Sequence, residues 1–170
     1  MNENQSHIKI RSQVREILIE EMLPGNAIEL KVTESLFSEH NDHFISILSA
    51  VRDLGVKVAI DDFGTGYSSL QRLKNLPIDN VKIDKCFIDN IQSSKEDEDI
   101  VKALILLSQT FNVDLVAEGV ETQAQALKLN LLGCSNHQRF LYSKPLRAAD
   151  FEQWLIQFRR THENQQKVNK

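Results

Sequence analysis

The stretch IDDFGTGYSSL, residues 60–70, is the part of the sequence that carries the strongest signal for the fold and for a functional site. It overlaps the end of an apolar run at 56–60, which is typical of a buried strand. Two adjacent carboxylates, Asp61 and Asp62, end that run, and two glycines then allow the backbone to turn sharply. Hard cations such as Mg2+ are bound by carboxylates together with substrate phosphates, so the stretch predicts a metal and phosphate site. The alternative is a turn that only reverses the chain.

Length and composition predict one ordinary globular domain. The chain has 170 residues, of which 41% are hydrophobic and 26% are charged. The net charge of -4 indicates no basic surface for a nucleic-acid polymer. No apolar run is long enough to span a membrane, and no signal-peptide core is present, so we expect a cytoplasmic protein. Cys86 and Cys134 lack a CxxC spacing and are expected to be buried free thiols.

Helical and strand patterns alternate along the chain. Helices are expected from amphipathic spacing at 8–23, 42–54 and 151–158, around 70–76, after the acidic run 96–99, and after the capping box of Thr122 and Gln125. Strands are expected at 28–33, 56–62, 80–85, 113–117 and 137–142. Such alternation predicts a parallel α/β sheet with right-handed crossovers. From residue 159 onward the chain is polar and is expected to fray.

Polar side chains collect where the expected strands end. Ligands bind at the carboxyl ends of the strands in parallel α/β sheets and barrels. The residues placed there are Glu34, Asp61, Asp62, Lys82, Asp84, Glu118, Glu121 and Gln138. The carboxylates predict one or two Mg2+ or Mn2+ ions, because paired ions clamp the attacking and leaving oxygens of a phosphoryl displacement. The alternative is that strand ends are polar only because they lie near solvent.

Lys82 is the cation of this set. A lysine beside metal ions orients or deprotonates the attacking water, or stabilises the charged phosphorane. A salt bridge with Asp84 or Asp62 is the alternative role. For Glu121 the alternative role is to bind the backbone of the loop.

Five motifs follow one another in order: VTES at 32–35, DDFGTGYSSL at 61–70, VKID at 81–84, AEGVET at 117–122 and YSKPL at 142–146. Together they resemble the EAL domain, the cyclic-di-GMP-specific phosphodiesterase of bacteria. The resemblance covers roughly residues 8–158. We therefore expect one EAL-type domain over 1–170, with its core at 8–158 and a polar tail at 159–170.

The resemblance implies a TIM-like (β/α)8 barrel with one reversed strand. It also implies hydrolysis of cyclic di-GMP, a second messenger in bacterial signal transduction, to linear pGpG with Mg2+ or Mn2+ in a two-metal site. The implied metal ligands are Glu34, Asp61, Asp62 and Glu118. The residues implied around the attacking water are Lys82, Glu118 and Gln138. Glu121 matches the acid that steadies the Asp-Phe-Gly loop, and the implied substrate-binding residues are Gly64, Tyr67 and Pro145.

Two departures from the family pattern bear on activity. The Glu-Ala-Leu segment and the following strand with its metal-binding asparagine are absent, so the first three barrel strands are expected to be missing and about five to remain. Losing these two ligands is expected to weaken the metal site, because ligand number and geometry set affinity. Arg139 stands where the family usually has glycine, where it would obstruct guanine or pair with phosphate. We therefore expect an inactive phosphodiesterase domain.

An incomplete barrel has two open sheet edges, which invite pairing with another chain. We expect a homo-oligomer or a partner chain that covers these edges, rather than a stable and active monomer. The alternative function is a non-catalytic EAL module that binds a protein partner or cyclic di-GMP. A receiver-type phosphate-binding domain is a third interpretation, which the extra acids Glu34 and Glu118 argue against. The pair Lys144-Pro145 does not support it, because the EAL family has the same pair within its Ser-Lys-Pro-Leu motif.

Overall fold

A single parallel sheet organises the molecule, and the computed structural model describes residues 3–33, 42–64, 73–140 and 143–168. The five strands lie in the order β1-β2-β3-β4-β5, and every neighbouring pair is parallel. The strands are β1 (Glu29–Thr33), β2 (Lys57–Phe63), β3 (Asn80–Ile83), β4 (Asp114–Val120) and β5 (Asn136–Arg139). This confirms the expected parallel α/β sheet. Within the described part of the chain, β1 and β5 are its two edges.

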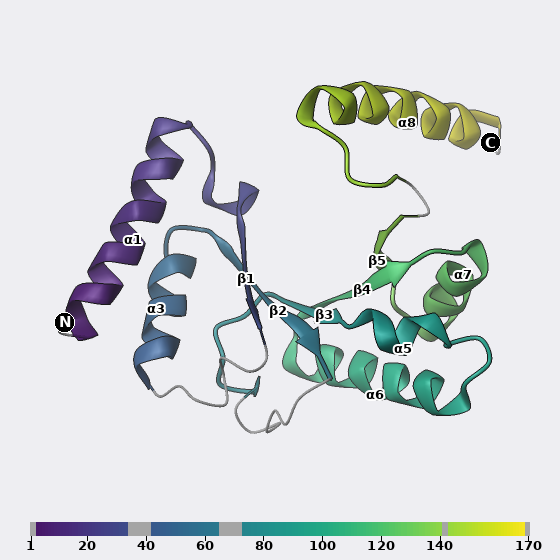
Figure 1. The fold of residues 1–170 in the computed structure, drawn as a ribbon, viewed down its shortest axis with the longest axis horizontal. Coiled ribbons are helices and arrows are strands. Elements are labelled where there is room, and N and C mark those ends of the chain that lie inside the picture. The colour runs from purple at the N-terminus through teal and green to yellow at the C-terminus, as the bar shows by residue number, and fades with distance from the viewer. Residues whose placement is uncertain (1–2, 34–41, 65–72, 141–142, 169–170) are drawn as a thin grey trace.

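Helices pack against the sheet and against one another (Figure 1). They are α1 (Glu3–Glu20), the 3-10 turn η1 (Gly25–Ala27), α3 (Asp42–Arg52), α5 (Lys85–Asp89), α6 (Lys95–Phe111), α7 (Gln123–Leu132) and α8 (Ala148–Val168). α1 packs on α3, α3 contacts β2, and α6 contacts β3 and β4. α8, yellow-green in Figure 1, lies beyond the end of β5 and away from the other helices.

The two faces of the sheet differ in chemistry because side chains alternate along each strand. One face is apolar and buried, and its side chains are Val32, Val58, Ile60, Val81, Ile83, Leu115 and Ala117. Each fully buried Val or Ile contributes about 1.5–3 kcal/mol of transfer free energy, so this face is a main source of stability. The residues in the alternate positions are mostly polar, namely Glu29, Lys31, Asp61, Asn80, Lys82, Glu118 and Gln138.

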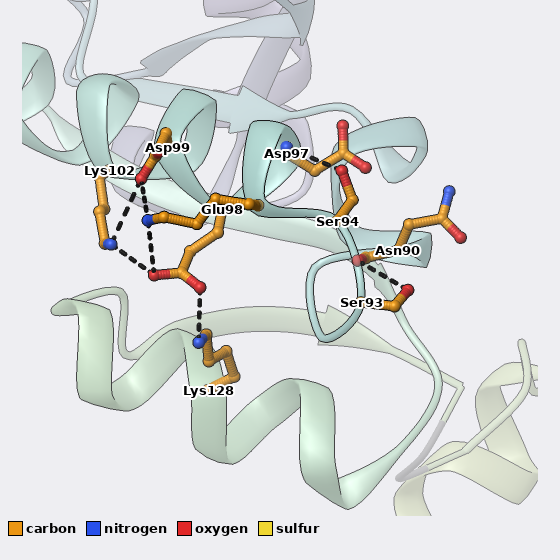
Figure 2. Close-up of polar contacts among 9 residues, drawn as sticks. Asn90, Ser93, Ser94, Asp97, Glu98, Asp99, Lys102 and Lys128 are labelled. Atoms are coloured by element: carbon orange, nitrogen blue, oxygen red, sulfur yellow. Dashed lines mark hydrogen bonds and ion pairs between the residues drawn. The ribbon is translucent and has the colours of Figure 1, made fainter.

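The N-termini of α6 and α7 form where the sequence predicted them. Ser94 caps α6 by accepting a hydrogen bond from the Asp97 amide at 3.1 Å (Figure 2), so the acidic run lies in the first turn as expected. Thr122 and Gln125 form the predicted capping box at α7, in which the Gln125 amide donates to Thr122 Oγ1 at 3.2 Å. α7 then ends at Gly133, whose φ of 101° favours glycine.

A charged cluster joins α6 to α7 (Figure 2). Glu98 lies on α6, and its Oε2 is 2.7 Å from Lys128 Nζ on α7. Its Oε1 also pairs with Lys102, one turn further along α6. The hydrogen bonds from Lys102 and then Lys128 lower the pKa of Glu98 to about 2. The cluster therefore connects two helices through one strongly acidic carboxyl group.

Several local expectations need correction. The strand expected at 80–85 ends at Ile83, because Asp84 instead caps α5, a helix that was not expected; its Oδ1 accepts from the Cys86 amide at 2.8 Å. α8 spans Ala148–Val168 rather than 151–158, so the segment after 159 continues as helix up to Val168. Both cysteines are free, but only Cys134 is buried and Cys86 is exposed. In the short helix expected around 70–76, residues 70–72 lie outside the described residues, Leu73 is helical, and 74–76 form a turn and a bend.

The strand expected at 137–142 is also shorter than predicted, since β5 covers Asn136–Arg139. No helix in the described ranges has the length and apolar character that crossing a membrane requires.

Candidate functional site

Two adjacent aspartates lie near the end of β2, at the carboxyl edge of the sheet. In a regular strand Asp61 and Asp62 would point to opposite faces. Here the pairing of β2 with β3 shifts register between Ile60 and Phe63, and Asp62 has a left-handed φ of 55°. An irregularity of this kind re-aims a side chain. As a result, one carboxylate oxygen from each of Asp61, Asp62 and Glu118 lies within 4.8 Å of the others.

The carboxylates of this cluster are arranged as a cation site would be. Burial raises the pKa of Asp62, and the neighbouring Asp61 charge raises it further. The Asp61 side chain is 18% exposed, and its Oδ1 atom is buried without a hydrogen-bond partner among the described residues. A buried carboxylate oxygen is costly to leave unsatisfied. The donor set of Asp61, Asp62 and Glu118 therefore fits a hard divalent cation such as Mg2+ or Mn2+.

Lys82 connects this cluster to the next strand. Its side chain is 8% exposed. The Nζ atom donates to Glu118 Oε1 at 3.0 Å and to Gln138 Oε1 at 3.1 Å. A buried ammonium needs such partners, and here they come from β4 and β5. The salt bridge considered from the sequence was with Asp84 or Asp62, whereas the structure pairs Lys82 with Glu118.

Lys31 is a site residue that sequence reasoning missed. It lies on β1, and its Nζ is 2.8 Å from Asp61 Oδ2 and 3.6 Å from Glu118 Oε1. The hydrogen bond to Asp61 raises the pKa of Lys31 above its ordinary value, so the amine is protonated at neutral pH. Lys31 lies in the middle of its strand, whereas the sequence predicts site residues at strand ends. The polar alternation of Glu29, Lys31 and Thr33 was the signal that could have found it.

Glu121 and Asp84 lie at the border of the cluster. Glu121 Oε1 accepts from Lys85 Nζ of α5 at 2.5 Å, so this acid pairs with a side chain in the described structure. Asp84 caps α5, and the hydrogen bonds from Cys86 lower the pKa of the Asp84 carboxyl group. Both acids therefore help to position α5 beside the end of β4.

An open cavity of about 510 Å³ lies beside the carboxylate cluster. Glu118 and Gln138 line one part of it, together with the expected substrate-binding residue Pro145. Aromatic side chains line another part, namely Phe140, Phe151 and Trp154. Phe151 and Trp154 of α8 stack with ring centroids 5.8 Å apart. The cavity thus places an apolar aromatic surface next to acids and a buried lysine.

Not every expected site residue can be placed. Glu34 and Tyr67 lie outside the described residues, as does the side chain of Arg139. Gly64 follows β2 with a φ of 99°. The expected residues that the structure brings together are Asp61, Asp62, Lys82, Glu118 and Gln138.

In sequence and in fold, the chain is similar to EAL domains. The EAL domain family model matches residues 2–145. The cyclic di-GMP phosphodiesterase NbdA of Pseudomonas aeruginosa is 40% identical over 156 residues, which is 92% of this chain and 20% of that protein. The chain spans about a fifth of the length of the curated relatives it matches.

Solved structures agree with the family match. The PaMucR phosphodiesterase in its c-di-GMP complex is 42% identical with a TM-score of 0.78, covering 82% of this chain and 57% of that one. BlrP1 of Klebsiella pneumoniae in its manganese and cy-diGMP complex is 33% identical with a TM-score of 0.73, covering 79% of this chain and 34% of that one. The open five-stranded sheet is therefore an incomplete version of the barrel expected for these domains, and the chain belongs to the EAL domain family.

Proposed function

We propose that this chain carries a cyclic di-GMP phosphodiesterase site of the EAL type, and that hydrolysis by the chain alone is impaired. The proposed domain is the whole of 1–170, with its core at 8–158. The observation that best supports the proposal is the cluster of Asp61, Asp62 and Glu118 next to Lys82. NbdA, whose name states this activity, is 40% identical to the chain.

Asp61, Asp62 and Glu118 would hold Mg2+ or Mn2+, with Glu34 as a further ligand from outside the described residues. The buried Oδ1 of Asp61 supports this assignment, because a cation would satisfy it. When bound, such an ion supplies a Lewis acid for the phosphate oxygen and makes a bound water more acidic.

The other residues of the site orient groups and bind substrate. Lys82 holds Glu118 and Gln138 in place, and its positive charge offsets the negative charge that develops on the phosphate. Because Gln138 Oε1 accepts from Lys82, the amide NH2 group faces elsewhere and can donate to a water or to a phosphate oxygen. Pro145 and Trp154 offer an apolar surface on which a guanine base can stack, with Gly64 and Tyr67 as further substrate contacts.

The chain's own lysines support impaired turnover. Two ammonium groups, those of Lys31 and Lys82, lie against the three clustered carboxylates and reduce the negative charge that attracts a divalent cation, although Lys82 is also 3.9 Å from Glu29 Oε1. Affinity for such a cation depends on ligand charge and ligand number. We expect the chain to bind cyclic di-GMP in the presence of Mn2+ without converting it to pGpG at a useful rate.

The test measures binding and turnover on the same sample. Binding of cyclic di-GMP is followed by calorimetry with Mn2+ or with EDTA, and pGpG is measured by chromatography. We expect binding that requires Mn2+ and is lost in Asp61→Asn, with pGpG at background. Binding that Asp61→Asn leaves unchanged would refute the site. Turnover that disappears in Asp61→Asn would support the site and refute the impairment.

The alternative function is a non-catalytic module that binds a partner or the dinucleotide. The specific observation in its favour is the pair of sheet edges, β1 and β5, which have no neighbouring strand within the described residues. Unpaired edges present rows of backbone donors and acceptors to another chain. We propose a second copy of the chain or a partner chain as their cover.

A further inference from the structure

We infer that Lys31 is a resident counter-ion of the carboxylate cluster, and that a divalent cation binds there only by displacing the Lys31 ammonium from Asp61. This inference rests on the proposed function, because it concerns the same cluster. It goes beyond that function because it states that the Lys31 ammonium competes with the metal ion for the same carboxylates. Lys31 lies on β1, whereas the three clustered acids lie on β2 and β4.

The Lys31 ammonium group lies close to the carboxylates of two of the three clustered acids, Asp61 and Glu118. Its Nζ lies 2.8 Å from Asp61 Oδ2, which is the distance of a charge-assisted hydrogen bond. The same atom is 3.6 Å from Glu118 Oε1. A hard divalent ion needs the oxygens of the same two carboxylates at about 2.0–2.6 Å. The ammonium and the ion would therefore share ligands at a few ångströms and repel each other.

Lys31 differs from Lys82 in how firmly it is held. Lys82 is 8% exposed and donates to both Glu118 and Gln138. The Lys31 side chain is 42% exposed, and the residue lies on the edge strand β1 opposite Ala59. A flexible four-carbon stem on an edge strand of the described sheet can move its ammonium group out to water. Lys31 is thus the displaceable cation, and Lys82 is the permanent one.

Displacement gives the cluster two alternative charge states. With Lys31 in place, Asp61 has an ammonium partner and the cluster is stable without metal. With Lys31 moved away, Asp61 Oδ2 becomes available next to the buried Oδ1 of the same carboxylate. The free energy of moving the lysine is then subtracted from the free energy of metal binding, so the observed affinity is weaker than the ligands alone would give.

The experiment compares Mn2+ binding by the wild-type chain and by Lys31→Met, which keeps an unbranched stem and removes the charge. Free Mn2+ is measured by electron paramagnetic resonance, so no substrate and no turnover are involved. Lys57→Met is the matched control, because it removes the same charge from the opposite end of β2. We expect Lys31→Met to bind Mn2+ about tenfold or more tightly than wild type, as charge count sets affinity. Lys57→Met should bind as wild type does.

Thermal unfolding supplies a second readout. Without metal, Lys31→Met should unfold at a lower temperature than wild type, because Asp61 has lost its partner, and Mn2+ should stabilise the variant more than it stabilises wild type. Equal Mn2+ affinity in wild type and Lys31→Met would overturn the inference while leaving the metal site intact. Absence of binding in both proteins would overturn the metal site of the proposed function and the inference with it.

Discussion

Gly119 is a position in the described structure at which a single added methyl group should disturb the site, because it lies between Glu118 and Glu121 and against α5. Its φ is 66°, in the left-handed region that favours glycine. A Cβ atom there would overlap Lys85 Cγ and would lie 2.7 Å from Lys85 Cβ. The Lys85 Cβ is attached to the backbone of α5 and cannot rotate away, so α5 itself must shift.

The cost of Gly119→Ala follows from these two effects. A left-handed conformation costs a residue with a Cβ about 1–2 kcal/mol. Overpacking of a filled space costs about 1–3 kcal/mol. We therefore expect Gly119→Ala to lower the free energy of unfolding by about 2–5 kcal/mol, which is a large part of the roughly 5–15 kcal/mol that stabilises a typical domain.

Gly133→Ala is the matched control for this prediction. Gly133 also has a positive φ, but the nearest atom to its added Cβ is Ile105 Cγ2 at an ordinary 3.7 Å. It should therefore show the conformational cost alone, about 1–2 kcal/mol. Both variants are measured by urea unfolding followed by circular dichroism, with the slope of the transition compared as well as the midpoint. Equal losses in the two variants would show that the contact with Lys85 has no energetic consequence.

Two further predictions concern the helices and the sheet edges. The pKa of the Glu98 carboxyl group is about 2 in the folded chain, compared with an ordinary value of 4.5. The ionised Glu98 therefore stabilises the fold fully above about pH 4.5, and this stabilisation is lost as the pH falls through about 2. Glu98→Gln should lower the melting temperature near neutral pH, with the difference from wild type disappearing toward pH 2; an equal effect of Glu96→Gln, in the same helical turn, would contradict the role of the α6–α7 cluster. Pairing at β1 or β5 should give a mass above that of one chain in sedimentation experiments, and a single-chain mass at every concentration would contradict it.

Much of the fold could be predicted because its signals are local. The capping box of Thr122 and Gln125 and the stop at Gly133 determine α7 by hydrogen bonds between near neighbours. α5 could not be predicted in the same way, because five residues are too short for an amphipathic repeat. Its start depends on the Asp84 side chain leaving the strand to cap it. The length of α8 was missed because a polar segment can continue a helix without any apolar stripe.

The site was predictable where its residues stand at strand ends. Asp61, Glu118 and Gln138 belong to three strands whose carboxyl ends meet at one edge, and that is a property of every parallel sheet. Two details of the site depend on three-dimensional geometry that the spacing of residues in the sequence does not reveal. One is the register shift that turns Asp62 into the cluster. The other is the contact between Lys31 and Asp61: the polar alternation of β1 indicates the face on which Lys31 lies, but not that its ammonium group reaches Asp61.

The order of strands in space is the same as their order along the chain, from β1 to β5. Each strand of the described sheet therefore pairs with the one synthesised just before it. A ribosome adds about 5–20 residues each second, so every new strand emerges within seconds of its template. No pairing within the described sheet has to wait for a segment beyond the next strand, so each pairing closes over a single crossover connection. The nascent polypeptide can thus assemble this sheet during translation. Each new strand pairs with the preceding strand, which at that time is the edge of the sheet.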